Sequence, residues 1–225
     1  MSARDGPVRI SPRPGRRGFR VQCRPPFDGA GDGMGKGRLE AFSDGVIAII
    51  LTIMVLEMKV PHGAEWRDLG ALWPVFLSYV LSFANIGIYW SNHHHFLHAA
   101  HRVDGRALWA NLHLLFWMSL VPFTTGWMGE NHFAPIPTAV YAFNLFMCAA
   151  SWRPMQSSLI RANGGERSEL AKAIGDDLKG KASLAMYGLA IPAAFWQPWA
   201  AGVLIVAVAL MWLAPDPRIE RRLAD

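Results

Sequence analysis

The chain has 225 residues, of which 52% are hydrophobic and only 17% are charged, against about 25% charged in ordinary soluble domains. Its apolar residues stand in blocks of about 20 with few charges, which is typical of membrane-spanning helices and excludes an ordinary water-soluble domain. The net charge of +5 lies entirely in residues 1–37, where there are eight Lys/Arg and three acids. The high pI therefore describes a tail and does not indicate a nucleic-acid partner.

Residues 1–37 are rich in Gly, Pro and Arg and contain no apolar run, so we predict a disordered basic tail without a signal peptide. Two interpretations of the tail remain open. Either translation starts at Met34, or the tail binds anionic lipid. The two cysteines, Cys23 and Cys148, indicate neither a disulfide framework nor a zinc site.

Six apolar segments follow, and they predict an all-α integral membrane protein with six transmembrane helices over residues 38–215. The segments are 38–60, 71–96, 107–128, 136–152, 182–196 and 199–213. Residues 153–180 are expected to form a charged loop, and Gln197-Pro198 predicts a tight turn between the last two segments. Residues 216–225 are left as a short tail.

The distribution of Lys and Arg predicts the orientation. The tail before the first segment has eight, the loop after the fourth has six, and the C-terminus has three. The 3–4 loop and the 5–6 turn have none. Because positively charged loops stay in the cytoplasm, both termini are expected there, in a multi-pass protein of the cell membrane.

The first segment carries an apolar stripe with one hydroxyl. On a helix, Thr52, Ile53 and Leu56 lie within about 60° of Ile49. The stripe alone is compatible with a face that contacts lipid or a neighbouring helix. Asp44 lies about 140° from Ile49, so it is expected to make an interhelical polar contact, because a buried acid needs a partner.

Several polar side chains are predicted at one cytoplasmic level. Since buried polar groups need partners, one network joining them is expected, and scattered solvation of the interface is the alternative. The residues are Arg38, Ser43, Asp44, Asn92, His93 and Asn111.

Histidines are concentrated at the end of the second segment. His94, His98 and His101 fall on one helical face if the helix continues that far, a spacing that can bind a metal. A secondary transporter of metal ions or protons, or a His-box membrane enzyme, would use this group, whereas a solvated helix end needs no metal. We expect no metal site and no cofactor. The sequence has no nucleophile–base pair, phosphate loop or CxxC motif, so we expect no enzyme.

Four stretches resemble one known family. They are RLEAFSDGVIAIILTIMVLEMKVP at 38–61, YWSNHHHFLH at 89–98, NLHLLFWMSLVPF at 111–123 and WLAPDPRIE at 212–220. Together they are similar to the prokaryotic branch of the endosomal and lysosomal potassium channels known as transmembrane protein 175. The family's motif appears here as Arg38, Phe42, Ser43, Asp44, Ala48, Ile49 and Thr52.

This resemblance implies a homotetramer of six-helix subunits that conducts potassium passively. The first helix of each subunit would line the pore, with a constriction at Ile49, Ile53 and Leu56 and with Thr52 beside it as a polar group. The motif's Arg, Ser and Asp would hold this helix against its neighbours. The long basic tail is not typical of the family.

Overall fold

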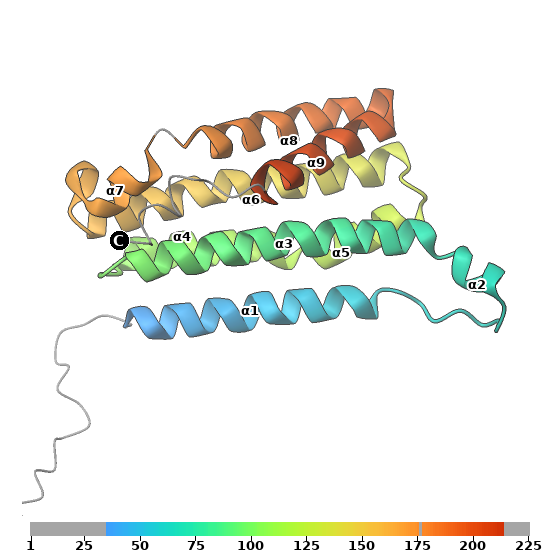
Figure 1. Cartoon of the computed structure of the whole chain (residues 1–225), viewed down its shortest axis with the longest axis horizontal. Helices are drawn as coiled ribbons and strands as arrows, with labels where there is room; N and C mark the ends of the chain where they lie inside the picture. The colour runs from blue at the N-terminus through green and yellow to red at the C-terminus, as the bar shows by residue number, and fades with distance from the viewer. Residues whose placement is uncertain (1–34, 176, 214–225) are drawn as a thin grey trace, which may run out of the picture. The chain divides into compact units, whose positions relative to one another are not determined.

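The computed structural model describes residues 35–175 and 177–213, and these residues form helices and loops without a strand (Figure 1). The predicted tail 216–225 and residues 1–34 of the N-terminal tail lie outside the described residues. The helices are α1 Lys36–Leu56, α2 Trp66–Gly70, α3 Trp73–Ala99, α4 Gly105–Ser119, α5 Val121–Glu130, α6 Pro135–Ala162, α7 Glu169–Ile174, α8 Leu178–Trp196 and α9 Pro198–Leu213, with a 3-10 turn η1 at Gly165–Arg167.

Two prolines explain where helices break. Pro198 follows Gln197, whose backbone is extended, and α8 passes directly into α9 there, as predicted. Pro122 stands in the first turn of α5, where it lacks the N–H that would continue α4. The predicted span 107–128 corresponds to the stretch Gly105–Glu130, in which α4 and α5 meet at Leu120.

Helix ends also differ from the prediction. The first helix stops at Leu56, four residues short of the predicted end. Helix α6 continues to Ala162 through Pro154, so it takes up part of the predicted charged loop, and η1 and α7 occupy much of the rest.

By length and hydropathy, two helical stretches in the described part are long and apolar enough to cross a membrane. They are Lys36–Leu56 and the continuous stretch Gly105–Glu130. Helix α9 is strongly apolar but shorter.

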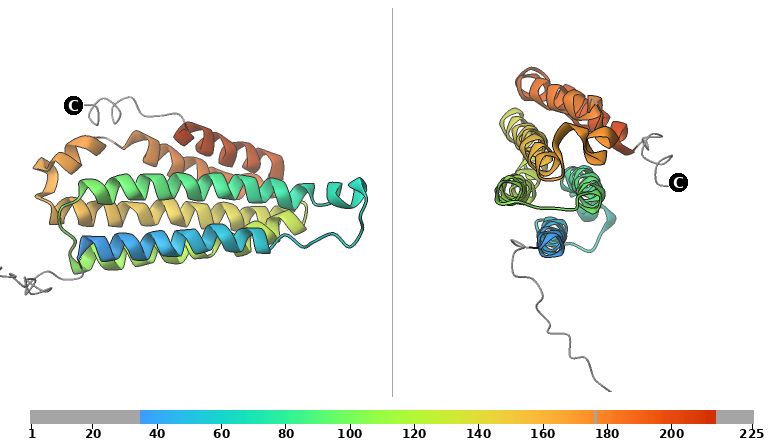
Figure 2. Two further views of the ribbon diagram at one scale, coloured as in Figure 1. Left: turned by 60° about the horizontal axis from the view of Figure 1, so that its bottom comes forward. Right: turned by 90° about the vertical axis from the view of Figure 1, so that its left-hand side faces the viewer.

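The helices pack side by side in one bundle. Helix α1 contacts α3, α4 and α5, whereas α8 packs against α6 and α9. In Figures 1 and 2, α1 accordingly lies at one side of the bundle, and α8 and α9 lie at the other. The core between them contains Ile86, Leu114, Tyr141 and Leu145, all fully buried.

Hydroxyl groups join the inner helices. The Ser82 hydroxyl lies 2.7 Å from that of Thr125 and 2.8 Å from that of Tyr141, which links α3, α5 and α6. Helices α3 and α5 also approach closely at Gly129, where a Cβ atom would lie only 2.8 Å from the Val75 Cα. Hydrogen bonds and small residues of this kind are what hold helices together where lipid gives no hydrophobic drive.

Candidate pore helix and its polar contacts

Helix α1 has one buried face and one exposed face. The buried face faces α3, α4 and α5, and it consists of Leu39, Ser43, Ile47, Ile50 and Met54. On the other side, Ile49 is 58% exposed, Ile53 40% and Leu56 78%. The apolar stripe predicted from the sequence thus contacts little within its own subunit, although branched apolar side chains normally gain by burial.

Two small or polar residues stand near this stripe. The Thr52 hydroxyl donates to the backbone carbonyls of Ala48 and Ile49, at 3.1 and 2.9 Å. Because its hydrogen is used there, the oxygen lone pairs remain available to an outside donor or cation. Gly45 is exposed, and a Cβ atom built on it would have nothing within 4 Å.

A buried chain of hydrogen bonds holds the N-terminal half of α1 against α3 and α4. His93 of α3 lies with its Nε2 2.7 Å from Asn111 Oδ1, and Asn111 Nδ2 donates to the Ser43 hydroxyl at 2.9 Å. Ser43 then donates to the Leu39 carbonyl at 2.8 Å. The three side chains come from three helices and are all at least 99% buried, so each hydrogen bond is made away from water, where an unpaired group is costly.

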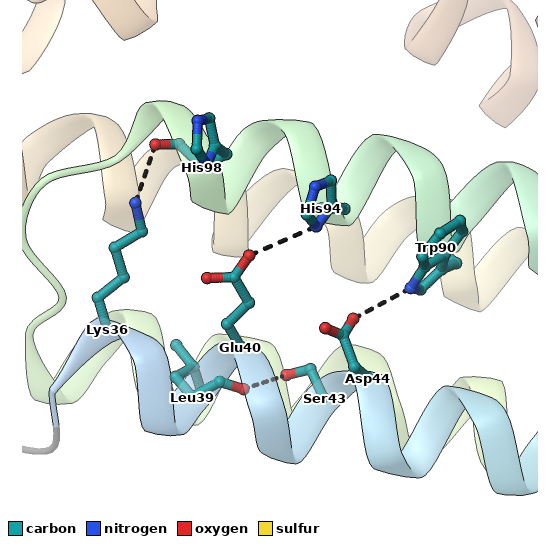
Figure 3. A network of polar contacts seen from close by, with 8 residues as sticks. All are labelled: Lys36, Leu39, Glu40, Ser43, Asp44, Trp90, His94 and His98. Carbon is teal, nitrogen blue, oxygen red and sulfur yellow. Dashed lines mark hydrogen bonds and ion pairs between the residues drawn. The ribbon is translucent and has the colours of Figure 1, made fainter.

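A second set of contacts runs along the edge between α1 and α3, as Figure 3 shows. Since α1 and α3 run in opposite directions, positions four residues apart on one helix meet positions four apart on the other. The contacts are Lys36 Nζ to the His98 carbonyl at 2.9 Å, Glu40 Oε1 to His94 Nδ1 at 3.4 Å, and Trp90 Nε1 to Asp44 Oδ1 at 3.1 Å. Sequence analysis missed Lys36, Glu40 and Trp90, although the 36, 40, 44 spacing was a visible signal.

The structure does not join all six predicted polar residues in one network. Ser43, His93 and Asn111 are together, and Asp44 bonds to Trp90 instead. Arg38 is exposed, and no hydrogen bond or ion pair to it occurs in the part of the chain that is described. Asn92 turns to another face of α3 and lines a cavity between α3, α6, α8 and α9.

The three histidines predicted on one face are not brought together. Helix α3 ends at Ala99, so the helical spacing does not extend to His101. His94 and His98 stack with ring centroids 6.1 Å apart, whereas the backbone N–H of His101 donates to Asn163. Within residues 35–175 and 177–213, no group of three or more metal-binding side chains is positioned to hold a metal.

The C-terminal end of α1 is followed by an exposed ion pair. Lys59 Nζ lies 2.7 Å from Glu130 Oε1 at the end of α5. This hydrogen bond and the carboxylate's charge raise the pKa of Lys59 above its usual 10.5.

Comparison with known proteins identifies a family to which this chain is similar. Residues 38–122, which cover nearly all of α1, α2 to α4 and the start of α5, match the family model described as endosomal/lysosomal potassium channel TMEM175. A protein named potassium channel from Chryseobacterium sp. (strain P1-3) is 50% identical over 192 residues, which are 85% of this chain and the whole of that protein.

Two more distant relatives agree with that match. The human protein named endosomal/lysosomal proton channel TMEM175 is 36% identical over 37% of this chain and 19% of its own length. The crystal structure of a lysosomal potassium-selective channel TMEM175 homolog from Chamaesiphon minutus superposes with a TM-score of 0.68 and 29% identity, covering 79% of this chain and 96% of that one. The resemblance found in the sequence is therefore confirmed: the chain belongs to the TMEM175 channel family.

Proposed function

We propose that four copies of the chain assemble around α1 as a passive, potassium-permeable cation channel. The observation that carries the proposal is the exposed face of α1, with Ile49, Ile53 and Leu56 in a row on a helix whose other face is buried. One apolar helix cannot enclose a water path, whereas four copies around a common axis can. Relatives named potassium channels support potassium as the permeant ion.

The chain is a membrane protein of a channel family and not an enzyme. Conduction down a gradient requires no cofactor and no covalent step. The stripe of α1 would supply rings of four branched side chains, and such a hydrophobic constriction gates by excluding water. Beside it, the Thr52 hydroxyl oxygen is the one side-chain oxygen placed near the stripe by helical periodicity, so selectivity for potassium over sodium is expected to be moderate.

The proposed topology has six spans with both termini in the cytoplasm. These spans are α1, α3, the α4–α5 pair, α6, α8 and α9, and the distribution of Lys and Arg supports their orientation. In this arrangement the contacts of Ser43, Asp44 and Lys36 all lie at the cytoplasmic end of α1. They would hold its inner half while the constriction lies farther along the helix.

The test compares two residues of α1 that are similarly exposed but lie on different faces of the helix. Ile53 is 40% exposed and lies on the stripe, whereas Val55 is 43% exposed and lies about 160° away around the helix. We expect Ile53→Asn to raise the single-channel current in planar bilayers and to weaken the preference for potassium, because a polar ring removes the dewetting barrier. Val55→Asn should leave both properties near those of the unmodified channel.

Two results would contradict the proposal. If Ile53→Asn changes the current no more than Val55→Asn does, the stripe is not the face that lines the pore. A purified protein that conducts as a monomer or dimer, by mass measurement in nanodiscs, would exclude four α1 helices around one axis.

A further inference from the structure

A cavity separate from α1 lies between α3, α6, α8 and α9. It has a volume of about 40 Å³, and the pair formed by the Tyr187 hydroxyl and Asn85 Oδ1, 2.9 Å apart, is part of its wall. Asn92 also lines it, on a face of α3 other than the one that meets α1. Nothing in the proposed conduction path uses this cavity.

Charged groups of both signs line the cavity. Arg153 comes from the middle of α6 and is exposed, and Asp177 precedes α8, where its carboxylate accepts a hydrogen bond from the Gly180 N–H at 3.1 Å. No ion pair joins Arg153 to Asp177 among the described residues. A molecule carrying a linked anion and cation therefore has a partner for each of its charges here.

Aromatic residues place this cavity at the membrane–water boundary. Trp152 and Trp212 both line it, and tryptophan is enriched at that level. Trp212 is fixed by a 2.8 Å hydrogen bond from its Nε1 to the Ser183 hydroxyl and by Lys179 Nζ, which lies 5.7 Å from its ring centroid. In the proposed topology this boundary is the cytoplasmic one.

The surrounding surface suits a lipid better than a soluble molecule. On α9, next to Trp212, Leu210 is 61% and Leu213 59% exposed. Helices α8 and α9 lie on the side of the bundle away from α1 (Figure 1), so this surface faces the bilayer when α1 lines the channel. Acyl chains lying on these leucines would bring a headgroup to the cavity mouth.

We propose that the cavity binds the headgroup of phosphatidylethanolamine from the inner leaflet, with its phosphate at Arg153 and its ammonium group at Asp177. The enclosed volume holds about three water molecules, so the charged atoms of the headgroup lie at the mouth with water beneath them. The proposal rests on the proposed topology and on α1 lining the channel, and bilayer current tests that channel function separately from lipid retention.

Native mass spectrometry of the full-length assembly tests this directly, after incubation with equal amounts of phosphatidylethanolamine, phosphatidylcholine and phosphatidylglycerol. We expect phosphatidylethanolamine to be retained about tenfold more than the others, since one charge-assisted hydrogen bond accounts for a difference of that size. The choline ammonium cannot donate a hydrogen bond to Asp177, and phosphatidylglycerol has no cation. Arg153→Gln and Asp177→Asn should each reduce retention about tenfold.

Matched controls separate lipid binding from folding and conduction. Asparagine caps a helix as well as aspartate, so Asp177→Asn keeps the start of α8 intact. Arg161→Gln removes an exposed arginine of the same helix that does not line the cavity, and it should retain lipid normally. Bilayer current, recorded on the same preparations, reports the channel function independently of lipid retention.

Three outcomes would overturn the proposal. They are equal retention of phosphatidylethanolamine and phosphatidylcholine, undiminished retention by Asp177→Asn in an assembled protein, and displacement of the bound lipid by an equal concentration of soluble glycerophosphoethanolamine. The last result would assign the cavity to a soluble zwitterion instead.

Discussion

Replacing Asn111 by leucine should loosen α1 from the rest of the bundle. Asn111 is the middle member of the chain from His93 to Ser43, and it makes a hydrogen bond on each side, at 2.7 and 2.9 Å. The leucine side chain has the same number of heavy atoms and the same branching as asparagine, so Asn111→Leu removes both bonds without opening a cavity. The loss is therefore mainly electrostatic.

The size of the effect follows from burial. Hydrogen bonds between membrane helices contribute on average about 0.6 kcal/mol each, so two of them account for about 1 kcal/mol. The variant also strands the His93 ring nitrogen, which is buried and whose other nitrogen already lacks a partner. A stranded buried group costs about 1–3 kcal/mol. The sum is roughly 2–4 kcal/mol, which corresponds to a fall in Tm of about 4–16 °C for a chain of this size.

Thermal unfolding of the purified assembly in nanodiscs measures this, with Asn131→Ala as the control. Asn131 is exposed and bonds only to the Trp127 carbonyl of its own helix, so its removal should change Tm little. A double variant that adds Ser43→Ala to Asn111→Leu should lose less than the sum of the two single variants, because both act on one hydrogen bond.

An unchanged Tm for Asn111→Leu would refute this reasoning, because it would mean that the hydrogen bonds from His93 through Asn111 to Ser43 add no net stability to the fold. Additive losses in the double variant would show instead that Ser43 and Asn111 act separately. An unchanged Tm would also leave the contacts along the α1–α3 edge to attach the N-terminal half of α1.

Three further predictions concern the topology, the Asp44 carboxylate and the Lys59–Glu130 ion pair. In a background without native cysteines, a cysteine at Gln197 should be labelled from outside intact cells, and one at Gly164 only from the cytoplasm; external labelling of Gly164 would reverse the topology. Asp44→Ala should reduce assembly in nanodiscs more than it alters the potassium-to-sodium current ratio, because the carboxylate bonds to an α3 tryptophan rather than facing the exposed stripe. Because the pKa of Lys59 is raised in the folded state, its ion pair with Glu130 stabilises the fold below about pH 10.5, and this stabilisation is lost as the pH rises through the folded-state pKa. Since the side chains of the pair are 81% and 43% exposed, the stabilisation is small, and Lys59→Met should leave Tm at pH 7 nearly unchanged.

The sequence was sufficient to predict which residues of α1 share the face of Ile49. Helical periodicity sets the angle between Ile49 and Ile50, and the structure finds one exposed and the other 3% exposed. Helical periodicity does not predict which residue of a neighbouring helix each side chain contacts. Asn92 and His93 share one level, yet about 100° separates them, so one faces the cavity and the other faces Asn111.

The break between α4 and α5 was missed for a related reason. Pro122 was visible, but the apolar run continued through it, and hydropathy does not distinguish one helix from two in line. Lys36 was missed because it was assigned to the tail, and its contact with the His98 carbonyl depends on how α1 and α3 are placed in register. Such pairings follow from tertiary packing rather than from local pattern.

The two faces of α1 have different consequences for the evolution of the protein. Replacements at Ile47, Ile50 or Met54 disturb packing within the subunit, so they are removed by selection whatever they do to ion flow. Replacements at Ile49 or Ile53 disturb the subunit less, because these side chains are 58% and 40% exposed within it. In the proposed channel, ion preference can therefore change by drift on one side of a helix while the other side keeps the subunit folded.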